Sequence, residues 1–172
     1  QLDVGAWKDP KFKGEKVPTL GQIIDALPAE KWFFVEIKDG PRIVEPIARI
    51  LAEKKPDPKK VVLISFSDEV VKACREKIPD YPAYLISSLK EFEKPGKPEE
   101  YLKVLEDSKA QGLLFKATAP VNAEWLKEAR GGDRVLFAWT VDEPALAKRM
   151  SDFGVEFIGS NRPGFLREEL AK

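Results

Sequence analysis

The stretch Trp32-Phe-Phe-Val-Glu-Ile-Lys-Asp-Gly40 decides the fold, because it has the pattern of a strand that begins apolar and ends charged. Side chains alternate between the two faces of a strand, and one face here carries Trp32, Phe34, Glu36 and Lys38. The first half is apolar on both faces, which is typical of a buried strand in a parallel sheet covered by helices. Ligands bind at the carboxyl ends of such strands.

Two interpretations of the charged end follow from these residues. In the first, Glu36 is a hard oxygen ligand for a divalent cation and Lys38 donates to an anion. In the second, the two side chains form a plain structural salt bridge. The strand alone does not choose between them.

The composition is that of a soluble globular protein. The chain has 172 residues, 43% of them apolar and 34% charged, with a formal net charge of zero. This balance gives no global electrostatic reason to expect binding to nucleic acid or to an anionic membrane. No apolar run approaches the roughly 20 residues of a membrane span. We therefore expect a soluble protein, whether cytoplasmic, periplasmic or secreted.

Two residue types limit the chemistry. The chain contains no histidine, which excludes Ser-His triads, histidine general bases and histidine-ligated zinc within these residues. The single cysteine, Cys74, lies in a helical apolar pattern and is expected to be a small core residue. An internal disulfide is impossible with one cysteine.

Short apolar runs alternate with helical patterns along the chain. Predicted strands cover 32–38, 61–66, 84–86, 112–116, 134–141 and 155–159. The candidate helix N-caps are Thr19, either Ser67 or Asp68, and Asn122. Six strand–helix units without a hairpin signal predict a parallel sheet. The charged stretch from Lys90 to Glu100 is expected to be a solvated loop, with a cover over the site as the alternative.

Polar residues recur where the predicted strands end, and they decide between two kinds of parallel sheet. They are Glu36 with Lys38, Ser65, Lys116, Trp139 with Thr140, and Ser160 with Asn161. Such groups converge on one mouth if the sheet closes into a barrel, whereas an open sheet places its site at one switch point. No Gly-x-Gly-x-x-Gly or Walker motif favours the open sheet. We predict a (β/α)₈ TIM-barrel type of fold, with about six β/α units in this chain.

Five segments, in order, resemble the glycerophosphodiester phosphodiesterase family. They are Gly5-Ala-Trp-Lys with Phe12-x-Gly-Glu-x-Val-Pro-Thr-Leu20, Phe34-Val-Glu-Ile-Lys38, Ser65-Phe66, Ala138-Trp-Thr-Val141, and Phe157-Ile-Gly-Ser-Asn-Arg-Pro163. The resemblance covers essentially the whole chain. It implies a (β/α)₈ barrel seen from its third strand onward.

The resemblance also implies a reaction, the metal-dependent hydrolysis of a small-molecule glycerophosphodiester to glycerol 3-phosphate and an alcohol. Glu36 would be one of three carboxylate ligands of Mg²⁺ or Ca²⁺, and Lys38 would stabilise the charge of the transition state. Phe66 and Trp139 would form the apolar wall beside the glycerol moiety. Lys116 is a further substrate-binding candidate. The structural alternatives are core packing for Phe66, backbone hydrogen bonding for Ser65, and a rim lysine reaching for solvent at Lys116.

The sequence departs from the family at its N-terminal side. The family's His-Arg-Gly, Glu-x-Asp and His-Asp motifs, which include two histidines that act as general acid and base, are absent from these residues. Asn161 stands where the family's last-strand motif has an aspartate. We expect residues 1–172 to be a single barrel domain lacking the first two strands, and to be inactive alone.

Several hypotheses about the whole protein remain open from the sequence. The chain is the retained part of a longer hydrolase, or it is a truncated, non-catalytic module that binds a phosphate ester or takes part in assembly. Two exposed sheet edges would favour association with a separate N-terminal segment or with a second copy. An unrelated α/β binding domain predicts instead that Glu36 and Lys38 point away from the other strand ends.

Overall fold

The computed structural model describes residues 2–93 and 97–172. Over these residues the chain forms a six-stranded parallel sheet whose strands follow one another in sequence order. The strands are β1 (Phe33–Glu36), β2 (Val61–Ser65), β3 (Ala83–Ser87), β4 (Gly112–Lys116), β5 (Val135–Trp139) and β6 (Phe157–Ile158). The prediction of six parallel strands is confirmed.

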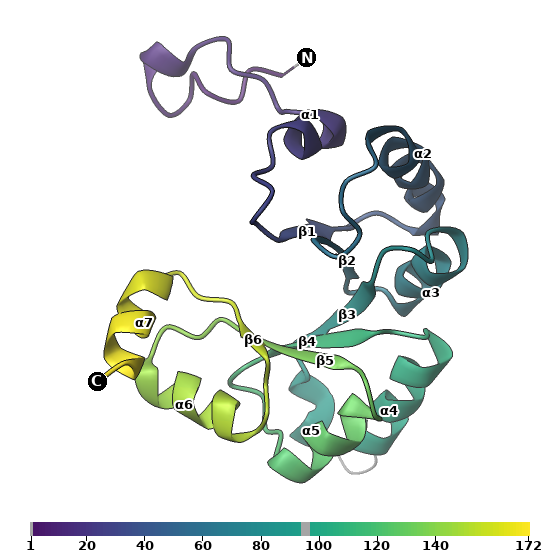
Figure 1. Cartoon of the computed structure of the whole chain (residues 1–172), viewed down its shortest axis with the longest axis vertical. Coiled ribbons are helices and arrows are strands. Elements are labelled where there is room, and N and C mark those ends of the chain that lie inside the picture. Colours follow the sequence, from purple (N-terminus) through teal and green to yellow (C-terminus); the bar gives the residue numbers. More distant parts are fainter. Residues whose placement is uncertain (1, 94–96) are drawn as a thin grey trace.

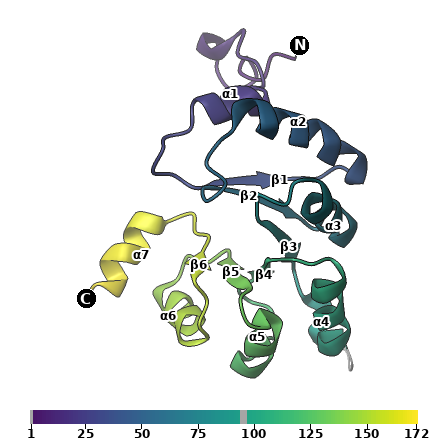
Figure 2. The ribbon, with the colours of Figure 1, turned by 45° about the vertical axis from the view of Figure 1, so that its right-hand side comes forward.

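The helices follow the strands in strict alternation. They are α1 (Leu20–Asp25), α2 (Val44–Lys54), α3 (Asp68–Lys77), α4 (Lys97–Asp107), α5 (Ala123–Arg130), α6 (Pro144–Asp152) and α7 (Pro163–Leu170), with short 3₁₀ turns η1 (Pro10–Phe12), η2 (Pro41–Ile43) and η3 (Lys90–Glu93). The sheet curls into an arc with helices on its outer side (Figure 1, Figure 2). The described residues thus form six β/α units in a curled half-barrel, as in part of a TIM-type barrel.

Side-chain caps fix the starts of three helices where the sequence placed them. Thr19 and Gln22 form a capping box at α1, in which each side chain accepts from the other residue's backbone N–H. Ser67, rather than Asp68, caps α3 by accepting from the N–H of its third residue at 3.3 Å. Asn122 caps α5 in the same way at 2.8 Å.

The sheet is apolar on both faces because each face has its own core. Side chains facing the helices, such as Leu63, Leu85 and Phe115, belong to the larger core. The intervening side chains point into the arc and form a smaller inner core of Val62, Ile64, Tyr84, Ile86 and Leu114, with Phe34, Val135, Phe137 and Trp139 packed against it. This second core explains why the strands lack the polar alternation of a one-sided sheet.

The inner core has one close approach that only glycine permits. A Cβ at Gly112 would lie 2.6–2.8 Å from ring carbons of Tyr84 on the neighbouring strand. The tyrosine ring therefore lies directly over the glycine, whose register partner it is.

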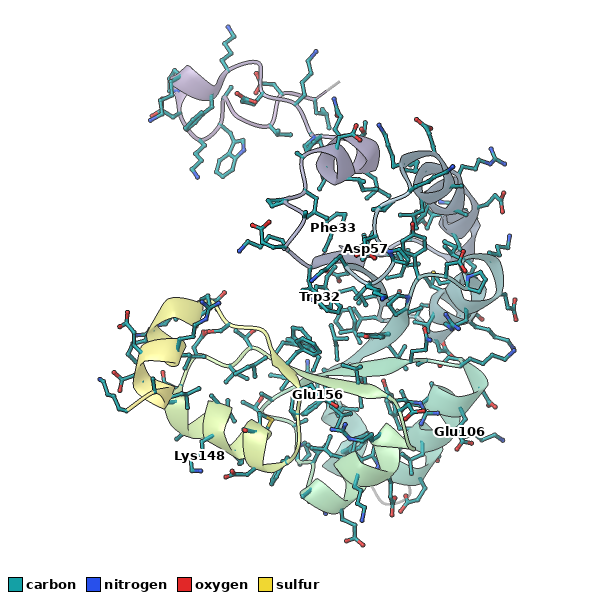
Figure 3. The ribbon with its side chains drawn as sticks, in the orientation of Figure 1. Trp32, Phe33, Asp57, Glu106, Lys148 and Glu156 are labelled. Carbon is teal, nitrogen blue, oxygen red and sulfur yellow. The ribbon has the colours of Figure 1, made fainter. Side chains whose placement is uncertain are left out.

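The first strand differs from its prediction. It covers Phe33–Glu36 rather than 32–38, and its residues are only partly buried because β1 pairs with β2 alone. Trp32, just before it, is 45% exposed. Its ring contacts Phe157 of β6 with centroids 5.7 Å apart, on the open side of the arc (Figure 3). Within the described chain, side chains rather than a strand ladder join the two edges of the sheet.

Other boundaries are shorter than the apolar runs that predicted them. The predicted strands 134–141 and 155–159 become Val135–Trp139 and Phe157–Ile158. The predicted loop from Lys90 to Glu100 is instead a 3₁₀ turn and the first turn of α4, except for residues 94–96, which lie outside the described residues. None of the described helices is long and apolar enough to cross a membrane.

Candidate active site

A cavity of about 220 Å³ lies at the carboxyl ends of the strands, inside the arc. It is lined by Glu36, Ile64, Phe66, Ile86, Leu114 and Trp139, which come from five neighbouring strands or the residues that follow them. We call it the mouth cavity. Its inner wall is apolar, and Glu36 brings a carboxylate to it. This convergence contradicts the unrelated-domain hypothesis, which required Glu36 to point away from the other strand ends.

Glu36 and Lys38 form an ion pair at the edge of the mouth cavity. The Lys38 Nζ lies 3.7 Å from the Glu36 Oε2, and the two side chains are 80% and 36% exposed respectively. Lys38 itself lies beyond the end of β1 and does not line the cavity. A pair this exposed contributes only about 0–1 kcal/mol to stability. The ammonium can therefore turn to an anionic ligand at little cost, so the salt bridge does not exclude a ligand-binding role.

Phe66 and Trp139 contact each other in the lining of the mouth cavity. Their rings meet edge to face, with centroids 6.2 Å apart and planes at 82°. Phe66 is 57% exposed, which argues against core packing as its purpose. The Trp139 Nε1 is buried and has no hydrogen-bond acceptor among the described residues. Such a donor normally has a partner, so this position is suited to an acceptor from a ligand or from another segment.

Lys116 and Ser65 occupy different surroundings from those residues. Lys116 is the register partner of Trp139 and is partly exposed, but it does not line the mouth cavity. Its substrate-binding role stays a prediction. Ser65 is buried, donates to the Ile37 carbonyl at 2.7 Å and accepts from the Ser67 N–H at 3.2 Å. The structural interpretation of Ser65 is therefore confirmed.

The last two strands end in a hydrogen-bonded network that the sequence analysis missed. The Asp142 carboxylate accepts from the Ser160 hydroxyl at 2.9 Å and from the Asn161 backbone and side-chain nitrogens at 2.8 and 2.9 Å. The Asn161 amide, together with these other donors, lowers the pKa of Asp142. Asn161 is thus a donor to a carboxylate, a role that an aspartate at this position could not fill when ionised. No local signal reveals the pairing, because the partners lie 18–19 residues apart.

The described residues do not make a complete divalent-cation site. They contain no group of three or more carboxylate, histidine or cysteine side chains that could hold a metal ion. Mg²⁺ and Ca²⁺ require about six or more oxygen ligands, and Glu36 supplies one carboxylate that already faces an ammonium. Any metal at Glu36 needs ligands beyond those described here.

Comparison with known proteins identifies the family. Residues 1–165 match the sequence profile of the glycerophosphoryl diester phosphodiesterase family. Because the match covers nearly the whole chain, the protein belongs to this family.

Individual relatives agree with that assignment. A glycerophosphodiester phosphodiesterase of Bacillus subtilis is 25% identical over 95% of this chain and 60% of its own length, and the B. subtilis protein YhdW is 26% identical over 96% and 67%. A phosphodiesterase from Oleispira antarctica, solved in complex with the product sn-glycerol-3-phosphate, superposes with a TM-score of 0.77 at 18% identity, covering all of this chain and 68% of the other. The chain therefore spans between 60% and 68% of these relatives, and at this identity the solved structure shows the fold alone.

Proposed function

We propose that the intact protein is a glycerophosphodiester phosphodiesterase, which hydrolyses glycerophosphodiesters to glycerol 3-phosphate and an alcohol. We propose that the mouth cavity of this chain binds the substrate. One observation carries the proposal: Glu36, Phe66 and Trp139, from three separate strands, line one cavity at the carboxyl end of the sheet in a member of this family. The Oleispira protein in complex with sn-glycerol-3-phosphate supports a substrate of this class.

Four residues in or near the mouth cavity have proposed roles in binding. Lys38 donates to the phosphate and adds positive charge where negative charge develops. Phe66 and Trp139 form the apolar wall beside the glycerol carbons. Lys116, the register partner of Trp139, is proposed as a further substrate-binding residue.

Catalysis would need groups that these residues lack. Glu36 is proposed as one metal ligand, but the described residues do not complete its site. The 172 residues contain no histidine, so the acid and base that the resemblance implies would have to come from a further segment or a second chain. The alternative is a non-catalytic phosphate-ester binding or assembly module. A single barrel domain lacking two strands remains our proposed description of residues 1–172.

The first test is binding of glycerol 3-phosphate to the 172-residue chain by calorimetry, with an assay of its release from a glycerophosphodiester in added Mg²⁺ or Ca²⁺. We expect binding without turnover. Lys38→Gln should weaken binding about tenfold, the scale of one charge-assisted hydrogen bond. Glu106→Gln is a control, because this exposed residue (labelled in Figure 3) lies in the last turn of α4, which leads to the start of β4, whereas the mouth cavity lies at the carboxyl ends of the strands.

The outcomes separate the hypotheses. Unchanged binding in Lys38→Gln would refute the placement of the phosphate. Turnover by the wild-type chain, abolished in Glu36→Gln but kept in Glu106→Gln, would show that it needs no further acid or base. Turnover that appears only in a longer form of the protein would favour the hydrolase over the binding module.

A further inference from the structure

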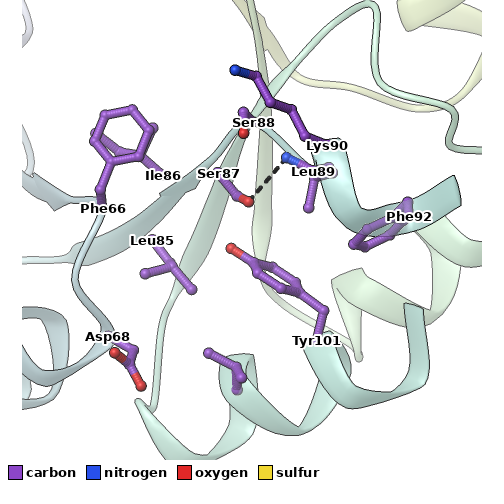
Figure 4. A pocket seen from close by; sticks show the side chains of 11 residues that line it. Phe66, Asp68, Leu85, Ile86, Ser87, Ser88, Leu89, Lys90, Phe92 and Tyr101 are labelled. Atoms are coloured by element: carbon purple, nitrogen blue, oxygen red, sulfur yellow. Dashed lines mark hydrogen bonds between the residues drawn. The ribbon is translucent and has the colours of Figure 1, made fainter. Parts of the chain in front are cut away.

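A second cavity of about 280 Å³ lies next to the mouth cavity, between the sheet and the helices rather than inside the arc. It lies between the end of β3, the start of α3, the turn η3 and the helix α4 (Figure 4). Its polar lining includes Asp68, Ser87, Lys90 and Tyr101, and its walls are apolar side chains of β3, η3 and α4. We call it the side cavity. The mouth residues described so far make no use of these polar groups.

The hydroxyls of Tyr101 and Ser87 point toward each other inside the side cavity (Figure 4). Burial raises the pKa of Tyr101 to about 12, so its phenol stays protonated at neutral pH. The Ser87 Oγ already accepts from the Leu89 N–H at 3.1 Å. The two hydroxyls have two hydrogens between them, and their mutual bond uses only one. Two hydroxyl donors therefore line the side cavity, and the pair can donate to a ligand oxygen.

Packing holds the Tyr101 hydroxyl in place. The Tyr101 ring meets Phe92 edge to face, with centroids 5.8 Å apart, and lies 6.4 Å from the ring of Trp125. Phe92 and Trp125 are themselves in edge contact at 4.5 Å. A donor fixed by three interlocking rings does not need to be ordered when a ligand binds.

Phe66 joins the two cavities. It lines both of them, and its ring contacts Trp139 on the mouth side. A diester whose glycerol phosphate occupies the mouth cavity would pass the Phe66 ring, which is 57% exposed, to place its other alcohol in the side cavity.

The side cavity gives no preference to a charged alcohol. Asp68 contributes a carboxylate and Lys90 an ammonium, so the lining carries one charge of each sign. Both side chains are exposed, and their opposite charges leave no net attraction for a cationic or an anionic group. Hydroxyl groups are suited to the lining, because each one can both donate to and accept from the hydroxyls of Tyr101 and Ser87.

We propose that the side cavity is the subsite for the departing alcohol of the diester and that it takes an uncharged polyol such as glycerol. The assignment to a diester rests on the proposed function above. The preference of the side cavity for a polyol rests only on the residues that line it. These two parts therefore need separate measurements.

The first measurement follows the backbone amide of Leu89 by NMR while free glycerol is added to the 172-residue chain. This amide donates to Ser87 and so reports on the side cavity whatever happens at the mouth. We expect its signal to shift with glycerol in the wild type and to shift much less in Tyr101→Phe. The matched control is Tyr81→Phe, which loses a hydroxyl bonded to the Pro56 carbonyl at the opposite end of β3.

The second measurement compares affinities for glycerophosphoglycerol, glycerophosphocholine and glycerol 3-phosphate. Tyr101→Phe should weaken glycerophosphoglycerol binding about threefold to tenfold, the range for one neutral hydrogen bond. Glycerol 3-phosphate, which lacks the second alcohol, should bind the variant as it binds the wild type. Tyr81→Phe should leave all three affinities unchanged.

Different failures overturn different parts. If glycerol does not move the Leu89 amide, or moves it equally in Tyr101→Phe, the polyol subsite is wrong. If glycerophosphocholine binds as tightly as glycerophosphoglycerol and loses the same affinity in Tyr101→Phe, the preference for an uncharged polyol is wrong. If glycerol moves the amide but glycerol 3-phosphate does not bind, the subsite stands and the proposed function fails.

Discussion

Replacing Ser65 with alanine tests how the exit of β1 is held in place beside the mouth. The Ser65 hydroxyl is buried and donates to the carbonyl of Ile37, the residue between Glu36 and Lys38. In Ser65→Ala this buried carbonyl loses its side-chain donor, which costs about 1–3 kcal/mol of unfolding free energy. For a domain of this size each kcal/mol lowers the melting temperature by about 2–4 °C, so a fall of about 2–12 °C is expected.

Ser108 offers a matched control, because it is equally buried but makes only a local bond. Its hydroxyl lies 3.3 Å from the Leu105 carbonyl, which also accepts from the Ala110 N–H at 3.2 Å. Ser108→Ala leaves that carbonyl with a partner and should cost less than about 1 kcal/mol.

Urea unfolding followed by circular dichroism measures both variants, and glycerol 3-phosphate affinity gives a second readout. We expect Ser65→Ala to lose affinity as well as stability, because the bond orients the segment that carries Lys38. Equal losses of stability in Ser65→Ala and Ser108→Ala would refute the argument that the long-range bond matters more than the local one.

Three further predictions concern other parts of the chain. Gly112→Ala should lose about 1–3 kcal/mol of unfolding free energy in urea, because its Cβ would overlap the Tyr84 ring, and an unchanged midpoint would contradict that contact. The pKa of Asp142 in the folded chain lies below its ordinary value of 3.8. The ionised carboxylate therefore stabilises the fold above pH 3.8, and this stabilisation is lost as the pH falls through the lower pKa of the folded chain. Asn161→Asp should therefore lower the melting temperature at pH 7, where two carboxylates would face each other, and the deficit should narrow toward pH 4; a deficit independent of pH would show that charge is not the cause. Burial raises the pKa of the Cys74 thiol to about 11, so a thiol reagent at pH 8 should label the folded chain far more slowly than the urea-unfolded chain, and equal rates would contradict its burial.

The sequence predicted the order and type of the elements because their signals are local. Apolar runs marked the strands, and Ser67 and Asn122 marked helix starts that the structure confirms. The prediction that β1 is buried was wrong, because burial depends on neighbours in space and β1 has one neighbouring strand in the described sheet. A run of apolar residues does not tell how many strands will flank it.

The sequence also predicted part of the candidate site, namely the residues that the strand ends bring together. Glu36, Phe66 and Trp139 converge as expected, because parallel strands place their carboxyl ends at one edge. The sequence did not decide whether Lys116 binds substrate, since a long side chain at the rim of a barrel can point in several directions. Tyr101 has no role predicted from the sequence, because nothing there shows that its hydroxyl meets Ser87, fourteen residues earlier, inside a cavity.

The sequential order of the strands has a consequence for folding kinetics. Every ladder of the described sheet joins units that are consecutive along the chain, so each pairing closes only a short loop and costs little entropy. The two edges of the sheet meet through the rings of Trp32 and Phe157, which lie far apart in the sequence, and not through a strand ladder. The ladders of the described sheet are therefore a linear array bent into an arc, and side-chain contacts inside the arc, such as Phe34 with Phe137, add contacts between strands that do not pair. Unfolding will begin at β1 and β6 and reach β3 and β4 last.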